Sequence, residues 1–145
     1  MAVRDILRQK GTYVLTVAPH VTVADAAFLL ARRTIGALPV VEDGRLVGMF
    51  SERVLVEAVS ARGSAALGLP VRAIMADAQA CSPDDSLRDL MARMTTRRLR
   101  HLPVVEDGRL VGIVSVGDVV KHRLREVTTE ANVLREYTTM MRAAA

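Results

Sequence analysis

The chain has 145 residues, of which 50% are hydrophobic and only 3% aromatic, and its formal net charge at pH 7 is +4. This size fits one compact domain or two small repeats that share a core, with the composition of an ordinary soluble globular protein. Its single cysteine excludes an internal disulfide and a cysteine metal cluster. The sequence also has no signal peptide and no run of the ~18–20 apolar residues that cross a bilayer, so we expect a cytoplasmic protein with no membrane partner.

The positive charge is carried almost wholly by arginine, because Lys10 and Lys121 are the only lysines. The arginines are scattered and have acidic neighbours, and they do not form a basic patch interleaved with aromatic residues, as single-strand binders use. The sequence therefore argues against nucleic acid as a partner. A small molecule that carries phosphate remains compatible with the charge.

The predicted elements follow the same order twice. A short strand (14–17 and 80–82) precedes a proline, and a helix then begins behind Thr22 or Ser86, each followed three residues later by an aspartate, as at helix N-termini. Two β-rich runs come next, 37–42 and 45–50 in the first copy. They are joined by Asp-Gly, the strongest short hairpin signal, because both turn positions require positive φ. A second helix follows each hairpin, so each copy is predicted to fold as β-α-β-β-α.

An internal repeat underlies this order. The segment Leu38–Gly48 recurs residue for residue as Leu102–Gly112, and Val3–Leu7 resembles Val71–Met75. Two copies, rather than a longer array, predict a pair related by a pseudo-twofold axis. The predicted organisation is a first repeat (1–62), a linker rich in Gly, Ala and Ser (63–70), a second repeat (71–125) and a C-terminal helical extension (126–145).

The C-terminal extension carries apolar residues at heptad spacing. The seam consists of Val120, Leu124, Val127, Ala131, Leu134 and Met141, and Thr138 interrupts it. This pattern predicts a helix that contacts a second copy of the chain, so we favour a homodimer. The alternative is a helix packed on its own domain, and the adjacent β-branched residues Thr128 and Thr129 weaken a long helix somewhat.

A phosphate-binding site is expected where each hairpin is followed by a helix, at Ser51 and Ser115. A helix N-terminus presents free N–H groups and a partial positive charge, which favour an anion. In the second copy Asp118 follows Ser115. Its carboxylate is suited to accept hydrogen bonds from two ribose hydroxyls, while the serine meets a phosphate oxygen. The same Ser-x-x-Asp pattern is also an ordinary capping box, and the pattern alone favours that simpler interpretation.

The repeat resembles the cystathionine-β-synthase (CBS) domain family. The resemblance rests on the strand–hairpin–helix unit closed by Gly-hydrophobic-hydrophobic-Ser-x-x-Asp, is closest over 100–115, and covers residues 3–125. It implies an α/β (α+β) tandem pair with two inter-repeat clefts. Such pairs bind AMP, ADP, ATP, NAD(H) or S-adenosylmethionine without converting it, and AMP is our first expectation. The implied role is regulation of an unidentified partner protein.

The resemblance also implies site residues. Ser82 and Pro83 would flank the adenine, the chain from Arg100 through His101 and Leu102 to Pro103 would hold its edge, Asp118 would bind the ribose, and Ser115 with a nearby arginine would bind phosphate. Arg53 and Arg97 are the further arginine candidates, and both also fit solvated surface positions.

The two copies differ at the position that is expected to bind the ribose. Val54 stands in the first copy where Asp118 stands in the second, and a valine cannot accept ribose hydroxyls. We therefore expect one competent site and one altered or empty cleft.

No enzyme is predicted. His101 has no serine or cysteine partner in a triad order, His20 and His122 lack partners at metal-ligand spacing, and Cys81 reads as a half-buried free thiol. A structural homodimer with vestigial clefts is the main alternative to the sensor, followed by a small nucleotide hydrolase and a nucleic-acid-binding protein.

Overall fold

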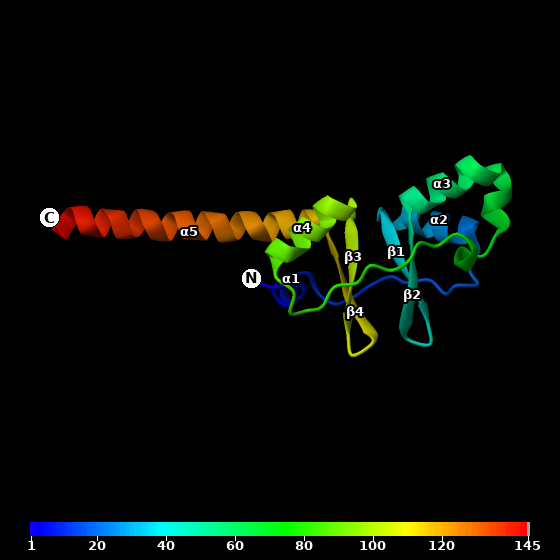
Figure 1. Ribbon diagram of the computed structural model, residues 1–145, viewed down its shortest axis with the longest axis horizontal. Coiled ribbons are helices and arrows are strands. Elements are labelled where there is room, and N and C mark those ends of the chain that lie inside the picture. Colours follow the sequence, from blue (N-terminus) through cyan, green and yellow to red (C-terminus); the bar gives the residue numbers. More distant parts are fainter. Residues whose placement is uncertain (145) are drawn as a thin grey trace.

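The computed structural model describes residues 1–144. Two antiparallel hairpins lie side by side with helices around them, and one long helix extends away from the body (Figure 1). The elements are α1 (Val3–Lys10), α2 (Val23–Arg33), β1 (Ala37–Glu42), β2 (Arg45–Ser51), α3 (Glu52–Arg62), the 3₁₀ helices η1 (Gly63–Gly68) and η2 (Val71–Ala73), α4 (Leu87–Arg97), β3 (His101–Glu106), β4 (Arg109–Ser115) and α5 (Val116–Ala144).

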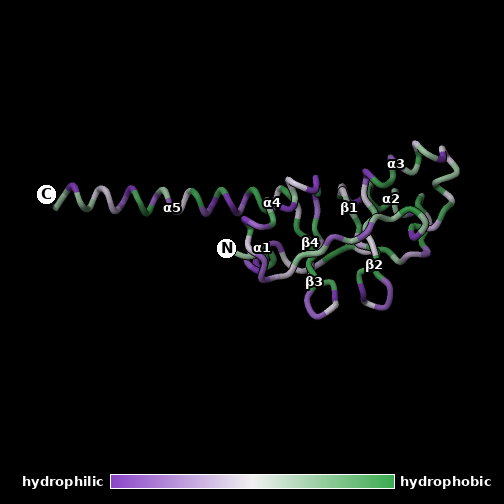
Figure 2. Tube along the Cα trace, in the orientation of Figure 1, coloured by the Kyte–Doolittle hydropathy of each residue, from purple (hydrophilic) through white to green (hydrophobic). Residues whose placement is uncertain are grey.

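Both predicted hairpins are present. Asp43 and Gly44 have φ of 53° and 77°, and Asp107 and Gly108 have 52° and 77°, which are the positive values that the Asp-Gly turns require. The short strand predicted ahead of each hairpin is reduced to single parallel bridges, from Val17 to Val40 and from Cys81 to Val104. Figure 2 shows hydrophilic hairpin tips, which point away from the apolar parts of the strands.

The helix starts predicted at Thr22 and Ser86 are confirmed. The Thr22 hydroxyl accepts a hydrogen bond from the Asp25 N–H at 3.2 Å, and the Ser86 hydroxyl accepts one from the Asp89 N–H at 3.1 Å. Each cap satisfies a backbone donor that the helix itself leaves free. The helices α2 and α4 therefore begin at equivalent places in the two copies.

Two hydrophobic cores form, one around each hairpin, and each core takes a segment from the other copy. Val3, Ile6 and Leu7 of α1 pack in the core of the second copy, among Leu87, Leu90 and Leu102. Val71, from the start of the second copy, packs in the first core, together with Val23, Leu38 and Phe50.

Main-chain hydrogen bonds fix this exchange. The Val3 N–H donates to the Asp85 carbonyl at 2.9 Å, and the Val71 N–H donates to the Val21 carbonyl at 2.7 Å. The two repeats seen in the sequence are consequently not the two packing units. Each packing unit needs both copies, so the pair is expected to fold as one body.

The segment 63–70 is an ordered part of this body. Gly63–Gly68 forms η1, whose Ala66 is fully buried, and the Leu69 carbonyl accepts a hydrogen bond from the Val23 N–H at 2.9 Å. The composition suggests a linker, but the chain here packs against α2 and α3. Among the helices of residues 1–144, none combines the length and the apolar character needed to cross a membrane.

Candidate functional site

Asp118 lies in the first turn of α5 in a reciprocal cap with Ser115. The Asp118 N–H donates to Ser115 Oγ at 3.1 Å, and the Ser115 N–H donates to Asp118 Oδ2 at 2.9 Å. This is the capping box that the bare pattern indicates. It also orients the carboxylate, whose side chain is 24% exposed and therefore open to a ligand.

Lys10, at the end of α1, reaches the same carboxylate from 108 residues away in the sequence. Its ammonium donates to Asp118 Oδ2 at 2.7 Å and to the Ile113 carbonyl at 3.0 Å. Burial by itself would raise the pKa of Asp118, but the hydrogen bonds from Lys10 and Ser115 outweigh it and lower the pKa. Asp118 is thus an ionised acceptor held in place. No pattern in the sequence points to Lys10, because its contact with Asp118 depends on the exchange of α1.

His101 lies at the junction of the two copies. In the hairpin it pairs with Ser115, and its ring packs so closely on the first copy that a Cβ built on Gly36 would lie 2.9 Å from Cε1. Burial, followed by the charges of Lys10 and Arg100, lowers the pKa of His101. The ring is therefore largely neutral at pH 7, and it borders both halves of the molecule.

An open cleft of about 420 Å³ lies at the start of α3, at the position where valine replaces the aspartate. This volume is in the range of small-molecule pockets. Both copies contribute: Gly36, Ala37, Met49, Ser51, Glu52, Arg53, Val54 and Glu57 from the first, and Ala76, Asp77, Gln79, Arg98, Leu99, Arg100 and His101 from the second. Arg53 Nε donates to Glu57 Oε1 at 3.0 Å, so this arginine is tethered at the rim.

The remaining predicted residues divide between this end of the molecule and its interior. Arg97 donates to the side-chain oxygen of Gln79, beside the open cleft. Leu102 is fully buried in the second core, and Pro103 is buried next to it. These two residues can therefore offer a ligand only their backbone.

Ser82 and Pro83 lie elsewhere. The bridge from Cys81 to Val104 places them beside the hairpin end of β3, whereas Ser115 lies at the opposite end of that hairpin, paired with His101. The Pro83 carbonyl accepts from the Arg4 N–H at 2.9 Å, and the Ser82 hydroxyl accepts from the Asp84 N–H at 3.3 Å. The structure does not bring these two residues together with Asp118. The part of this segment that borders the open cleft lies earlier, at 76–79.

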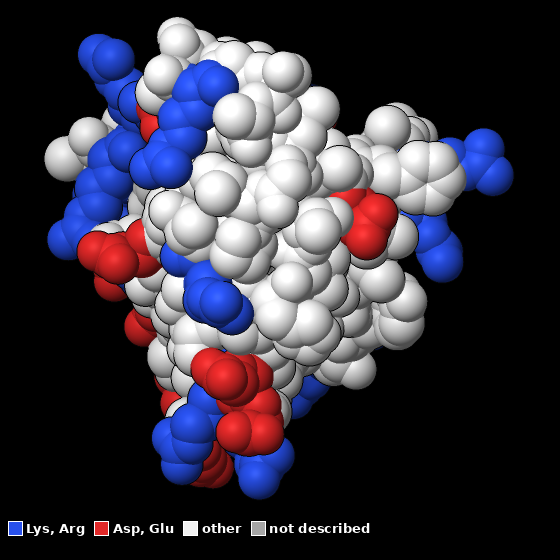
Figure 3. All heavy atoms as spheres, turned by 90° about the vertical axis from the view of Figure 1, so that its right-hand side faces the viewer, with Lys and Arg blue, Asp and Glu red and all other residues white. Residues whose placement is uncertain are grey.

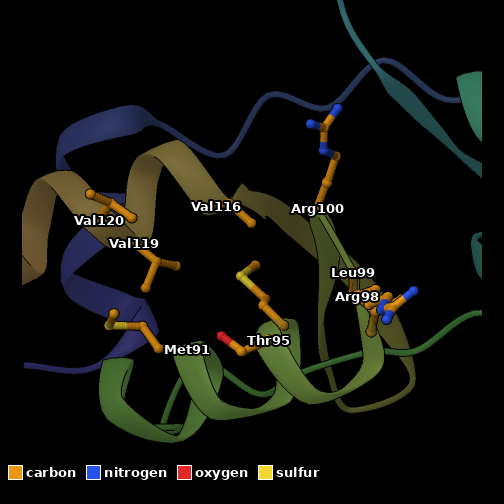
Figure 4. Close-up of a pocket in the computed structure, with 9 residues that line it drawn as sticks. Met91, Thr95, Arg98, Leu99, Arg100, Val116, Val119 and Val120 are labelled. Carbon is orange, nitrogen blue, oxygen red and sulfur yellow. The ribbon is translucent and has the colours of Figure 1, made fainter.

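A second cavity, of about 330 Å³, opens between α4 and α5 (Figure 4). Its lining is mostly apolar, with Met91, Met94, Leu99, Val116, Val119 and Val120. The side chains of Arg98 and Arg100 extend away from Met91 and Val119 (Figure 4). Apart from Thr95, Arg98 and Arg100, this lining offers a polar ligand few hydrogen-bond partners.

The end of the molecule formed by α2, α3 and η1 has a largely uncharged surface. Lys and Arg side chains gather along one edge of this face, and acidic and basic groups mix toward its lower end (Figure 3). This face therefore presents no continuous basic track for a nucleic-acid backbone.

Comparison with known proteins agrees with this architecture. The CBS domain model matches residues 3–61 and 71–125. YhcV, a CBS domain-containing protein of Bacillus subtilis, is 36% identical over 114 residues, which are 78% of this chain and 81% of that protein. The crystal structure of a CBS-domain-containing protein from Agrobacterium tumefaciens is 44% identical and superposes with a TM-score of 0.81, covering 85% of this chain and 99% of that one.

Two similar structures contain adenosyl ligands. CBSX2, solved in complex with AMP, is 30% identical with a TM-score of 0.72, covering 86% of this chain and 96% of its own. The CBS pair of MJ0100, solved with 5′-methylthioadenosine and S-adenosylmethionine, is 25% identical with a TM-score of 0.73, covering 83% and 98%. The predicted fold, a tandem pair of α/β repeats with a C-terminal helix, is confirmed. The chain belongs to the CBS domain family.

Proposed function

We propose that this protein is a regulatory module that binds an adenosyl ligand, AMP first among them, against Asp118 and does not convert it. The observation that carries the proposal is the Asp118 carboxylate, which is ionised, partly open and oriented by Ser115. Such a group is suited to accept hydrogen bonds from two ribose hydroxyls. The AMP and S-adenosylmethionine complexes of similar CBS pairs support this ligand class.

The residues that would bind the rest of the ligand are proposed from their positions in the structure. Phosphate would lie near the Ser115 end of α5, where helix N–H groups favour an anion. Arg100 and His101 border the same junction, Arg53 lines the open cleft from the first copy, and Arg97 contacts Gln79 beside that cleft. Ser82 and Pro83 are left out of this proposal because they lie at the other end of β3.

Regulation requires a ligand that distinguishes two states of the protein. AMP would compete with Lys10 for Asp118 Oδ2, and so would act on the contact between α1 and α5. A second copy of the chain and a regulated protein partner would bind the two states with different affinities. The second candidate function is a structural or protein-interaction module with vestigial clefts, which Val54 favours because it leaves the open cleft without a carboxylate at the position equivalent to Asp118.

Thermal unfolding with AMP, ADP, ATP, NAD, NADH and S-adenosylmethionine tests the proposal, with CMP and ribose 5-phosphate as controls. A ligand present at ~100 times its Kd adds about 2.7 kcal/mol to the free energy of unfolding and raises Tm by several degrees. We expect a shift with at least one adenosyl ligand and none with CMP. An unchanged Tm with all six would contradict the proposal and favour the structural module.

Replacing Lys10 with methionine tests the competition for Asp118. We expect adenosine to bind more tightly, because the carboxylate is free, and AMP to gain less or to bind more weakly, because the displaced ammonium no longer meets the phosphate. The preference for AMP over adenosine should fall about tenfold, the equivalent of ~1.4 kcal/mol. Isothermal titration of both ligands measures this ratio, and an unchanged ratio would show that Lys10 plays no part in phosphate binding.

A further inference from the structure

The second half of α5 has no partner within its own chain. Val119 and His122 are buried, and Arg123 and Glu126 are half-buried, but every described side chain from Val127 to Ala144 is exposed. Figure 1 shows this part of the helix extending away from the body. The prediction of a C-terminal helix is therefore met, and the alternative of a helix packed along its own domain does not hold for this segment.

The exposed segment is not a solvated polar helix. Leu134 is 65% exposed and Met140 is 69% exposed, and Val127, Val133, Tyr137 and Met141 are exposed with them. Figure 2 shows apolar and polar bands alternating along its length. A single helix of this length is only marginally stable in water, and a continuous apolar stripe indicates a contact surface.

The spacing of the stripe indicates what covers it. Val120, Leu124, Val127, Ala131 and Leu134 alternate steps of four and three residues, which is the seam of a two-stranded coiled coil. Thr138 continues the seam as a polar residue, and its hydroxyl donates to the Leu134 carbonyl of the same helix at 2.9 Å. The seam therefore buries no unsatisfied hydroxyl at this position.

The charges beside the seam favour a second copy in parallel orientation as the partner. With Leu124 and Ala131 at a positions, Glu130 is a g residue and Arg135 is the e residue of the next heptad. In a parallel pair these two positions lie beside each other between chains, so the symmetric dimer forms two such ion pairs. An antiparallel pair of the same segment would instead place the e residue Arg135 of both chains along one edge, where the two arginines repel.

We propose that residues 127–141 of α5 form a parallel coiled coil with the same segment of a second copy. The two bodies would then lie at the same end of the dimer. This inference rests on the exposed seam and its charges, and it stands whether or not the protein binds a nucleotide.

Light scattering coupled to size-exclusion chromatography tests the seam. We expect the full chain to be a dimer at micromolar concentration, and Leu134→Glu to raise the dimer Kd at least ~10-fold, because it places a charge in the seam. The control is Thr129→Glu, an equally exposed change on the outer face of the helix, which should remain dimeric. Leu134 is 65% exposed on the part of α5 that extends away from the body, so this variant should fold. A monomeric parent, or a Leu134→Glu variant as dimeric as the parent, would overturn the proposal.

Charge reversal tests the orientation. Glu130→Lys should weaken the dimer, and adding Arg135→Glu should restore it, because the pair is then re-formed with opposite signs. If the double variant dimerises no better than Glu130→Lys, the two helices are not parallel, and that part of the proposal is wrong.

Discussion

Replacing Asp118 with alanine is expected to weaken AMP binding about 10- to 100-fold, because hydrogen bonds to a charged group contribute ~1.5–3 kcal/mol and each ~1.4 kcal/mol is a factor of ten. The carboxylate is the acceptor that the proposal assigns to the ribose, and it is already ionised and oriented before a ligand arrives. Isothermal titration of the purified variant with AMP measures the change directly.

Two controls make this result specific. The variant also loses its part of the α5 cap, which should cost about 1 kcal/mol and lower Tm by ~2–4 °C, so a folded protein remains for titration. Val54→Asp is the matched variant that should gain AMP binding, because it introduces a carboxylate at the equivalent position of the open cleft. We expect it to increase the number of AMP molecules bound per chain. If Asp118→Ala bound AMP as tightly as the parent, the ligand would have to lie in the open cleft instead.

Replacing Ile6 with alanine is expected to lower the free energy of unfolding by about 2–5 kcal/mol, the range for truncating a buried isoleucine or leucine. Ile6 is fully buried although it lies near the N-terminus, because α1 supplies part of the core around the second hairpin. Chemical denaturation followed by circular dichroism gives the loss of stability. A change below ~0.5 kcal/mol, as at exposed positions, would contradict the exchange of α1.

Native-state hydrogen exchange shows which of the two hairpins loses stability. With Ile6→Ala, the amides of β3 and β4 should lose more protection than those of β1 and β2, because the cavity lies in the second core. Val71→Ala is the reciprocal control, since Val71 is fully buried in the first core. It should affect β1 and β2 more. If both variants affected the hairpin of their own copy, the exchange would be wrong.

Much of the fold is local, and the sequence determines it. The Asp-Gly turns, the Thr22 and Ser86 caps and the heptad seam depend on a few neighbouring residues, and each produces the predicted element. The exact repeat of Leu38–Gly48 indicates two equivalent units for the same reason, and it supports the assignment to the CBS family. At the candidate site, the sequence likewise identifies Ser115 and Asp118, which lie within one helical turn of each other.

Only the tertiary structure decides which distant segments meet. Packing α1 against the second hairpin, rather than against its own, brings Lys10 to Asp118 and makes each core depend on both copies. The same packing places 76–79, and not Ser82 and Pro83, at the cleft. These contacts join residues far apart in the chain, and they form because the exchanged segments bury apolar side chains such as Ile6 and Val71. The position of a residue within its repeat carries no information about such long-range burial.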